Sequence, residues 1–245
     1  MKRTPAITVL FCALISGVPA LAKVTIIRSV FELNEHKRTF YWFAPDVAGP
    51  LPIVVLLHGS GRDGAVMANA WKDLAAKERF MIAAPDSYNS ALWETMDDTP
   101  EFLHAVVDQV RAVHPVDDSR IYLFGHSAGA SYGLLLALTD SDYFAAIAVH
   151  AGALWPENYR LLEQPTRKMP LAIWVGSKDQ NFPVEDVLAT KRAFEAHGFQ
   201  VDVHVIQGAT HNYDNFSEEL DNYAWTFLKD KKLPAPEASA GQPGP

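Results

Sequence analysis

The fold of this chain is decided by the stretch 120–138, which reads RIYLFGHSAGASYGLLLAL. Its first five residues form an apolar run typical of a buried strand, and residues 128–138 have the composition of a helix. Between them stands Gly125-x-Ser127-x-Gly129. Because bare flanking positions let a strand and a helix pass very closely, this pattern predicts a sharp turn that projects the Ser127 hydroxyl. A nucleophilic serine is presented in the same strand–turn–helix context.

Apolar runs alternate with helical patterns on both sides of this turn. We expect strands at 24–27, 39–43, 52–57, 80–85, 120–124, 145–149, 171–175 and 201–206. We expect helices at 65–79, 98–113, 128–138, 187–197 and 218–228, the second with the Asp-Thr-Pro-Glu start of a capped helix at residue 98. Such alternation predicts one doubly wound α/β domain, with a mostly parallel sheet and helices on both faces.

A serine hydroxyl is a poor nucleophile without a base, so a histidine must lie within reach of Ser127. In the chain order Ser…Asp…His, the base follows the acid and lies in a loop after the last strand. His211 meets this condition. His197 falls at the end of a predicted helix and His204 inside the final strand, so we select His211.

The acid that orients this histidine should follow the preceding strand. Asp179 lies in the loop just past the predicted strand 171–175. Asp186 is the main alternative, but it stands further from the strand end, at the start of the next helix. Asp202 and Asp214 fit less well by position.

Acyl chemistry also needs donors for a developing oxyanion. One predicted donor is the backbone amide of Ala128, the residue after the nucleophile. The other should come from the turn after the strand 52–57, where the sequence is His-Gly-Ser-Gly. The Ser60 amide is the first choice and the Gly61 amide the alternative, whereas we interpret His58 as a brace for the turn.

These motifs resemble those of the α/β-hydrolase superfamily over residues 53–228. The matching segments are Leu57-His58-Gly59-Ser60-Gly61, Gly125-His126-Ser127-Ala128-Gly129, Gly176-Ser177-Lys178-Asp179 and Thr210-His211. The chain looks most like the polyhydroxyalkanoate-depolymerase and feruloyl-esterase-like group, and nearly as much like small carboxylesterases; the pair Asp97-Asp98 and the run 145–152 support this. Members of that group often have cysteines or an attached substrate-binding module, and residues 23–245 contain neither.

The resemblance implies an α/β-hydrolase fold and a serine esterase that cleaves carboxylic esters, small or polymeric, without a cofactor. About 20 residues separate the strand ending at Val149 from the strand starting at Leu171, which leaves no room for a large lid domain. Trp93 and Trp155 are candidates to line an acyl or aromatic pocket. The alternative is that both pack against the sheet edges.

The first 22 residues have the pattern of a secretory signal peptide. A positive start precedes the apolar run 6–18, and Ala20-Leu21-Ala22 supplies a cleavage pattern with the cut after Ala22. This run is shorter than the roughly 20 residues that a membrane span needs. A buried N-terminal helix and lipid attachment at Cys12 are the alternatives.

We therefore expect a secreted or periplasmic protein with three parts: a signal peptide over 1–22, an α/β-hydrolase domain over 23–233, and a disordered Pro-, Ala- and Gly-rich tail over 234–245. The only cysteine lies in the first part, so the remainder has no disulfide and no thiol nucleophile.

Charge and motif content exclude other classes of protein. The chain has 21 Lys and Arg against 29 Asp and Glu, a formal net charge of −8, which disfavours nucleic-acid binding. No nucleotide-binding glycine motif occurs. Glu101, His104 and Asp108 share a helix face, but a solvated face explains them as well as a metal site does, so we expect no metal.

The sequence thus predicts an exported esterase, with Ser127 as nucleophile, His211 as base and Asp179 as orienting acid. Acyl transfer and peptide hydrolysis could use the same residues, and a noncatalytic hydrolase-fold protein is a third alternative. The acyl group, the alcohol and the oligomeric state stay open.

Overall fold

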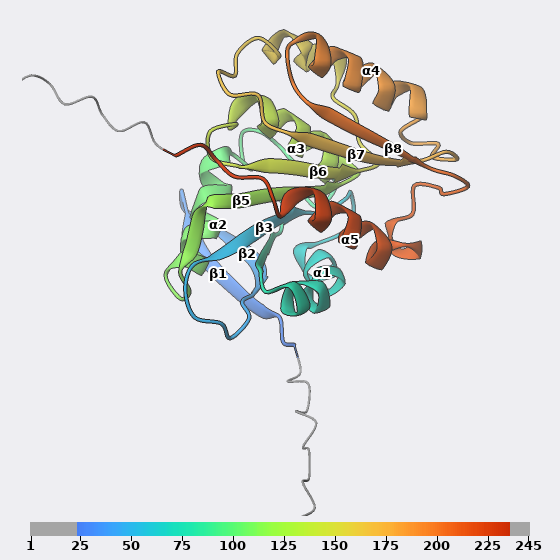
Figure 1. Ribbon diagram of the computed structural model, residues 1–245. Helices are drawn as coiled ribbons and strands as arrows, with labels where there is room; N and C mark the ends of the chain where they lie inside the picture. Colours follow the sequence, from blue (N-terminus) through green and yellow to red (C-terminus); the bar gives the residue numbers. More distant parts are fainter. Residues whose placement is uncertain (1–23, 236–245) are drawn as a thin grey trace, which may run out of the picture.

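The computed structural model describes residues 24–235, which fold around a central sheet (Figure 1). The strands are β1 (Ile27–Leu33), β2 (His36–Phe43), β3 (Leu51–Leu57), β4 (Met81–Pro85), β5 (Val116–His126), β6 (Ala146–His150), β7 (Leu171–Gly176) and β8 (Val201–Ile206). The helices are α1 (Gly64–Glu78), α2 (Pro100–Arg111), α3 (Ala128–Thr139), α4 (Val184–Ala196) and α5 (Ser217–Leu228), with short 3-10 helices η1 (Pro156–Leu161) and η2 (Tyr213–Asn215).

The described strands form one eight-stranded sheet in the order β1-β2-β4-β3-β5-β6-β7-β8. The six strands from β4 to β8 in that order run parallel, and only β2 pairs antiparallel with its neighbours β1 and β4. The prediction of a mostly parallel, doubly wound sheet is therefore confirmed. Since parallel strands end at the same edge, the loops that follow β3, β5, β7 and β8 can meet there.

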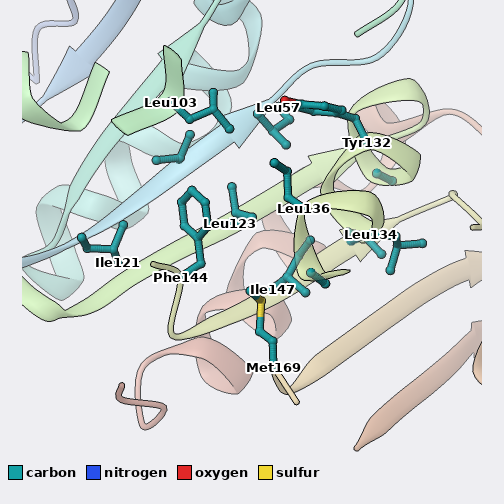
Figure 2. Packing of buried hydrophobic residues seen from close by; sticks show 14 of the residues in the cluster. Leu57, Leu103, Ile121, Leu123, Tyr132, Leu134, Leu136, Phe144, Ile147 and Met169 are labelled. Atoms are coloured by element: carbon teal, nitrogen blue, oxygen red, sulfur yellow. The ribbon is translucent and has the colours of Figure 1, made fainter. Parts of the chain in front are cut away.

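Two hydrophobic cores lie on opposite faces of this sheet. Side chains alternate along β3, so that Ile53, Val55 and Leu57 face one core while Val54 and Leu56 face the other. The first core is covered by α2, α3 and α4, and the second by α1 and α5, which lie together in Figure 1. Figure 2 shows the first core, where side chains of β3, β5 and β6 meet those of α2 and α3. Nearly continuous apolar strands fit this burial on both faces.

The first hairpin differs from the expected boundaries. A strand was expected at 24–27, but β1 runs over Ile27–Leu33, and the turn lies at Asn34 and Glu35, both with positive φ. The burial pattern of β1 shows it to be a largely exposed edge strand. An edge strand needs no continuous apolar run, so hydrophobicity was a poor guide to its limits.

The start of α2 also differs. The sequence pattern placed the start at Asp98, whereas the helix begins at Pro100 with Thr99 as N-cap, and the Thr99 hydroxyl accepts a hydrogen bond from the Phe102 amide. Asp98 instead turns inward and binds Arg38. Asp98 therefore forms a long-range ion pair, and Thr99 provides the local cap in its place.

The segment between β6 and β7 contains the short helix η1 and no further domain, as expected for a fold without a large lid. No helix within residues 24–235 is both long enough and apolar enough to cross a membrane. The predicted signal peptide and residues 236–245 of the predicted tail lie outside the described residues.

Candidate active site

Ser127 stands at the sharp turn between β5 and α3, with φ 55° and ψ −117°. An L-residue rarely adopts this conformation, which is typical of positions held by surrounding structure for function. A Cβ added at Gly125 would lie 2.3 Å from the carbonyl oxygen of Gly129, and one added at Gly129 would lie 2.3 Å from that of Leu57. The turn can therefore form only with glycine at both positions.

A chain of hydrogen bonds runs from this serine to a buried carboxylate. Ser127 Oγ lies 2.8 Å from His211 Nε2, and His211 Nδ1 lies 2.9 Å from Asp179 Oδ2. His211 comes from the loop after β8 and Asp179 from the loop after β7. The other carboxylate oxygen, Asp179 Oδ1, accepts hydrogen bonds from the amides of Asn181 and Phe182 at 2.9 Å. Asp179 is thus held in place from both sides, aimed at the imidazole.

The alternative acids and bases lie elsewhere. Asp186 belongs to the first turn of α4, and Asp214 binds the guanidinium of Arg62. His204 lies in β8 and stacks on Trp174 of β7, with ring centroids 5.0 Å apart. The remaining two alternatives are Asp202, inside β8, and His197, at the C-cap of α4.

The two predicted oxyanion amides flank Ser127. Ala128 is the first residue of α3, and Ser60 lies in the turn after β3. A Cβ added at Gly59 would lie 3.2 Å from Ser127 Cβ, so this turn runs directly beside the predicted nucleophile. The amide of Gly61 donates to the Ser90 carbonyl at 2.7 Å. That bond commits the Gly61 amide and favours Ser60 as the second donor.

His58 fixes the turn after β3. Its Nδ1 lies 2.9 Å from the Gly59 carbonyl oxygen, and its Nε2 accepts a hydrogen bond from the Ser87 amide at 3.0 Å. Its own carbonyl accepts the indole N–H of Trp93 at 2.9 Å. Burial lowers the pKa of this histidine, which favours the neutral ring that these bonds require. His58 therefore joins the turns that follow β3 and β4.

A pocket of about 390 Å³ opens beside the serine. It is lined by Ser60, Leu92, Trp93, Thr95, Ser127, Ala128, Ser131, Tyr132, Leu135, Trp155, Asn158 and Phe182. Trp93 is buried and stacks on Tyr132, with ring centroids 5.4 Å apart. Trp155 is half exposed and packs against Phe182, with ring centroids 6.0 Å apart. The structure thus places both tryptophans on the pocket and not at the sheet edges.

Phe182 was missed by the sequence reasoning, although it lies only three residues after Asp179. Its ring stacks against the His211 imidazole at 5.8 Å, which closes that side of the pocket. A signal was available, because a loop that carries the acid beside the histidine also brings its next residues there.

A buried histidine pair lies behind the site and was also missed. His126 Nδ1 and His150 Nδ1 are 3.0 Å apart, and the His126 ring lies 5.1 Å from that of His211. Burial, reinforced by the charges of neighbouring histidines, lowers the pKa of His126 and of His150 to about 3. Both rings are therefore neutral at physiological pH.

Two of the three residues considered for a metal have other partners. His104 Nε2 lies 2.8 Å from Asp140 Oδ2, and Asp108 pairs with Arg111. Among residues 24–235, no group of three or more His, Cys, Asp or Glu side chains is arranged to hold a metal ion.

The sheet order, the strained serine between β5 and α3, and the loops that bring a histidine and an aspartate to it define an α/β-hydrolase. Residues 40–231 match the model of the dienelactone hydrolase family. The chain belongs to this family.

Two curated proteins are similar to part of this chain. Poly(3-hydroxyalkanoate) depolymerase C of Paucimonas lemoignei is 30% identical over 151 residues, 56% of this chain and 36% of the relative. NocK of Nocardia uniformis subsp. tsuyamanensis, named as an esterase, is 29% identical over 153 residues, 58% of this chain and 44% of the relative. The matched part therefore spans less than half of either relative. A solved ferulic acid esterase superposes with a TM-score of 0.68 at 15% identity, covering 84% of this chain and 98% of that one.

Proposed function

We propose that this protein hydrolyses carboxylic esters through an acyl-enzyme on Ser127. The observation that carries the proposal is the continuous chain Ser127 Oγ, His211 Nε2, His211 Nδ1 and Asp179 Oδ2, with both links at hydrogen-bond length. A serine in a strained turn, bonded to a histidine that a buried carboxylate orients, is the arrangement of an activated nucleophile. Hydrolase family membership and relatives named as a depolymerase and an esterase support ester substrates.

In the first half of the reaction, Ser127 Oγ attacks the ester carbonyl carbon while His211 Nε2 takes the hydroxyl proton. The amides of Ala128 and Ser60 receive the oxyanion, and the N-terminus of α3 favours negative charge at the same place. The intermediate collapses when the carbon–oxygen bond to the alcohol breaks and His211 returns its proton to the departing oxygen. Asp179 stabilises the imidazolium that exists between these steps.

In the second half, water takes the place of the alcohol. His211 removes a proton from water as its oxygen attacks the acyl carbon, and then returns that proton to Ser127 Oγ. The products are a carboxylic acid and an alcohol, and the enzyme is restored. The described side chains supply every proton transfer, and the mechanism calls for no cofactor.

The first test is hydrolysis of p-nitrophenyl esters from acetate to palmitate, together with methyl ferulate. We expect turnover by the native protein and a loss of about three orders of magnitude or more in kcat for Ser127→Ala. Asp179→Asn should lose comparable activity because the imidazole loses its orienting partner. Ser217→Ala, at the start of α5, is the matched control and should retain full activity.

A native protein that is folded yet hydrolyses none of these esters would overturn the proposal. Peptide substrates and alcohol acceptors then become the next assays, since peptidases and acyltransferases can use the same three residues.

We also propose that the protein acts outside the cytoplasm, in the periplasm or the medium, on the basis of the signal-peptide pattern in residues 1–22. Expression of the full chain in a bacterium followed by fractionation and N-terminal sequencing tests this. We expect an exported form that begins at Lys23. Retention in the cytoplasm with Met1 in place would overturn the proposal.

A further inference from the structure

One face of α3 forms the inner wall of the pocket. Ala128, Ser131, Tyr132 and Leu135 all line it, with the spacing of three and four residues that places side chains on one side of a helix. Ser131 is therefore one helical turn beyond the nucleophile on the wall that a bound acyl group must follow.

The Ser131 hydroxyl is buried and has no hydrogen-bond partner among the described residues. Ser131 as a whole is only 7% exposed. A serine inside a helix usually bonds to the carbonyl four residues earlier, which here belongs to Ser127. That carbonyl already accepts the amides of Ala130 at 2.9 Å and Ser131 at 3.0 Å. Both of its acceptor positions are occupied, so the hydroxyl is left without a local partner.

The other buried polar groups of the pocket are already engaged. The Trp93 indole donates to the His58 carbonyl, and the Tyr132 hydroxyl donates to the Asp98 carbonyl. Thr95 is exposed and Asn158 partly exposed, so both can reach water at the mouth. The inner wall is otherwise aromatic or aliphatic. Ser131 Oγ is thus a buried polar atom of this wall that makes no hydrogen bond within the described residues.

We propose that Ser131 is a specificity-determining residue that hydrogen-bonds an oxygen carried by the acyl chain. The assignment rests on the proposed esterase function and narrows its substrate class to hydroxyacyl esters. Side chains four residues apart on a helix are separated by about 6 Å. A hydroxyl on the second to fourth carbon of an acyl group attached to Ser127 spans that gap. A plain acyl chain would cover the Ser131 hydroxyl without pairing it, which is unfavourable.

The experiment compares matched p-nitrophenyl esters: lactate with propionate, and 3-hydroxybutyrate with butyrate. We expect the native protein to prefer the hydroxy ester of at least one pair about tenfold in kcat/KM, a typical gain for one paired hydrogen bond. In Ser131→Ala the same ratio should fall to about one, because only the hydroxy ester loses a hydrogen-bond partner. Leu135→Ala is the matched control, because it enlarges the same wall without altering a polar atom, and it should leave the ratio unchanged.

Stability supplies a second readout. Because Ser131→Ala removes an unpaired buried hydroxyl, its Tm should equal or exceed that of the native protein. A Tm lower by several degrees would show that the hydroxyl is bonded within the fold and would overturn the assignment. Equal hydroxy-to-plain ratios in the native protein and in Ser131→Ala, with all four esters cleaved, would overturn it while leaving the esterase function intact. Absence of any hydrolysis by folded native protein would overturn the esterase function itself.

Discussion

Arg62 and Asp214 form a two-pronged ion pair that joins the turn after β3 to the 3-10 helix after His211. Arg62 Nη1 lies 2.8 Å from Asp214 Oδ1, and the second guanidinium nitrogen contacts Oδ2. One partner is two residues beyond Ser60 and the other three residues beyond His211. The pair therefore fixes the distance between a predicted oxyanion amide and the predicted base.

Replacement of Arg62 by Ala should lower kcat clearly while changing the free energy of unfolding only slightly. Both partners are partly exposed, so the ion pair contributes less than about 1 kcal/mol to folding. The freed turn should cost about three- to tenfold in kcat because the amide and the imidazole lose their fixed spacing. Steady-state kinetics and thermal unfolding test this, with Arg192→Ala, from an exposed pair on α4, as control. Unchanged kcat in Arg62→Ala would refute the positioning role.

Two glycines near the turn should respond very differently to alanine. At Gly125 the added Cβ would meet backbone at 2.3 Å, which cannot move without displacing α3. At Gly133 it would meet only the end of the Ile147 side chain, at 2.7 Å, which can rotate away. We expect Gly125→Ala to yield no folded enzyme and Gly133→Ala to remain folded and active, as judged by circular dichroism and ester hydrolysis. Normal folding of Gly125→Ala would contradict the described turn.

The buried ion pair of Arg38 and Asp98 should be expensive to break. Arg38 Nη2 lies 2.5 Å from Asp98 Oδ1, and the same carboxylate accepts the amides of Tyr88 and Glu94. These bonds hold the loop that carries Trp93 into the pocket. Removal of one member of a buried pair leaves an uncompensated charge, so Arg38→Met should lose about 3–5 kcal/mol in urea unfolding. Lys77→Met, from a surface pair, should lose less than about 1 kcal/mol; equal losses in both variants would disprove the argument.

The His126–His150 pair predicts loss of stability in acid. The folded pKa of each is about 3, below the unfolded value near 6.5. Between these values the unfolded chain binds protons that the folded protein does not, so the free energy of unfolding falls as pH decreases from 6.5 towards 3. The slope is at most about 1.4 kcal/mol per pH unit for each histidine.

Chemical unfolding between pH 8 and pH 4 measures this slope. The variant His126→Phe/His150→Phe should show a shallower dependence on pH, whereas His36→Gln, at an exposed position, should keep the native dependence. If the double variant retained the native slope, the pair would not be the source of acid sensitivity.

Local patterns predicted the central strands of the sheet well, because burial on both faces imposes a continuous apolar run. Strand β3 and residues 121–126 of β5 are buried on both faces, so their apolar runs are continuous and easily recognised. Ser127 and Asp179 each follow such a run, in β5 and β7, whereas His211 follows β8, a largely exposed edge strand. Because parallel strands end at one edge, chain order alone was enough to bring the three together.

Long-range partnerships could not be predicted in this way. Asp98 resembles a helix cap until Arg38, 60 residues earlier, is placed beside it. His150 meets His126 because β5 and β6 pair with these two residues in register, and register is not written in either strand separately. The Ser131 hydroxyl is exceptional only because the carbonyl of Ser127 is already used. Each of these features depends on contacts with another part of the chain.

The positive φ of Ser127 lowers the stability of the protein at the same position that the proposed mechanism requires. Backbone in this region costs a residue with a Cβ about 1–3 kcal/mol, and glycine escapes most of that cost. We therefore expect Ser127→Gly to be more stable than the native protein and to have no hydrolytic activity. Selection for thermal stability alone would favour the loss of Ser127, the proposed nucleophile. Directed evolution of this chain must therefore also select for turnover at every round.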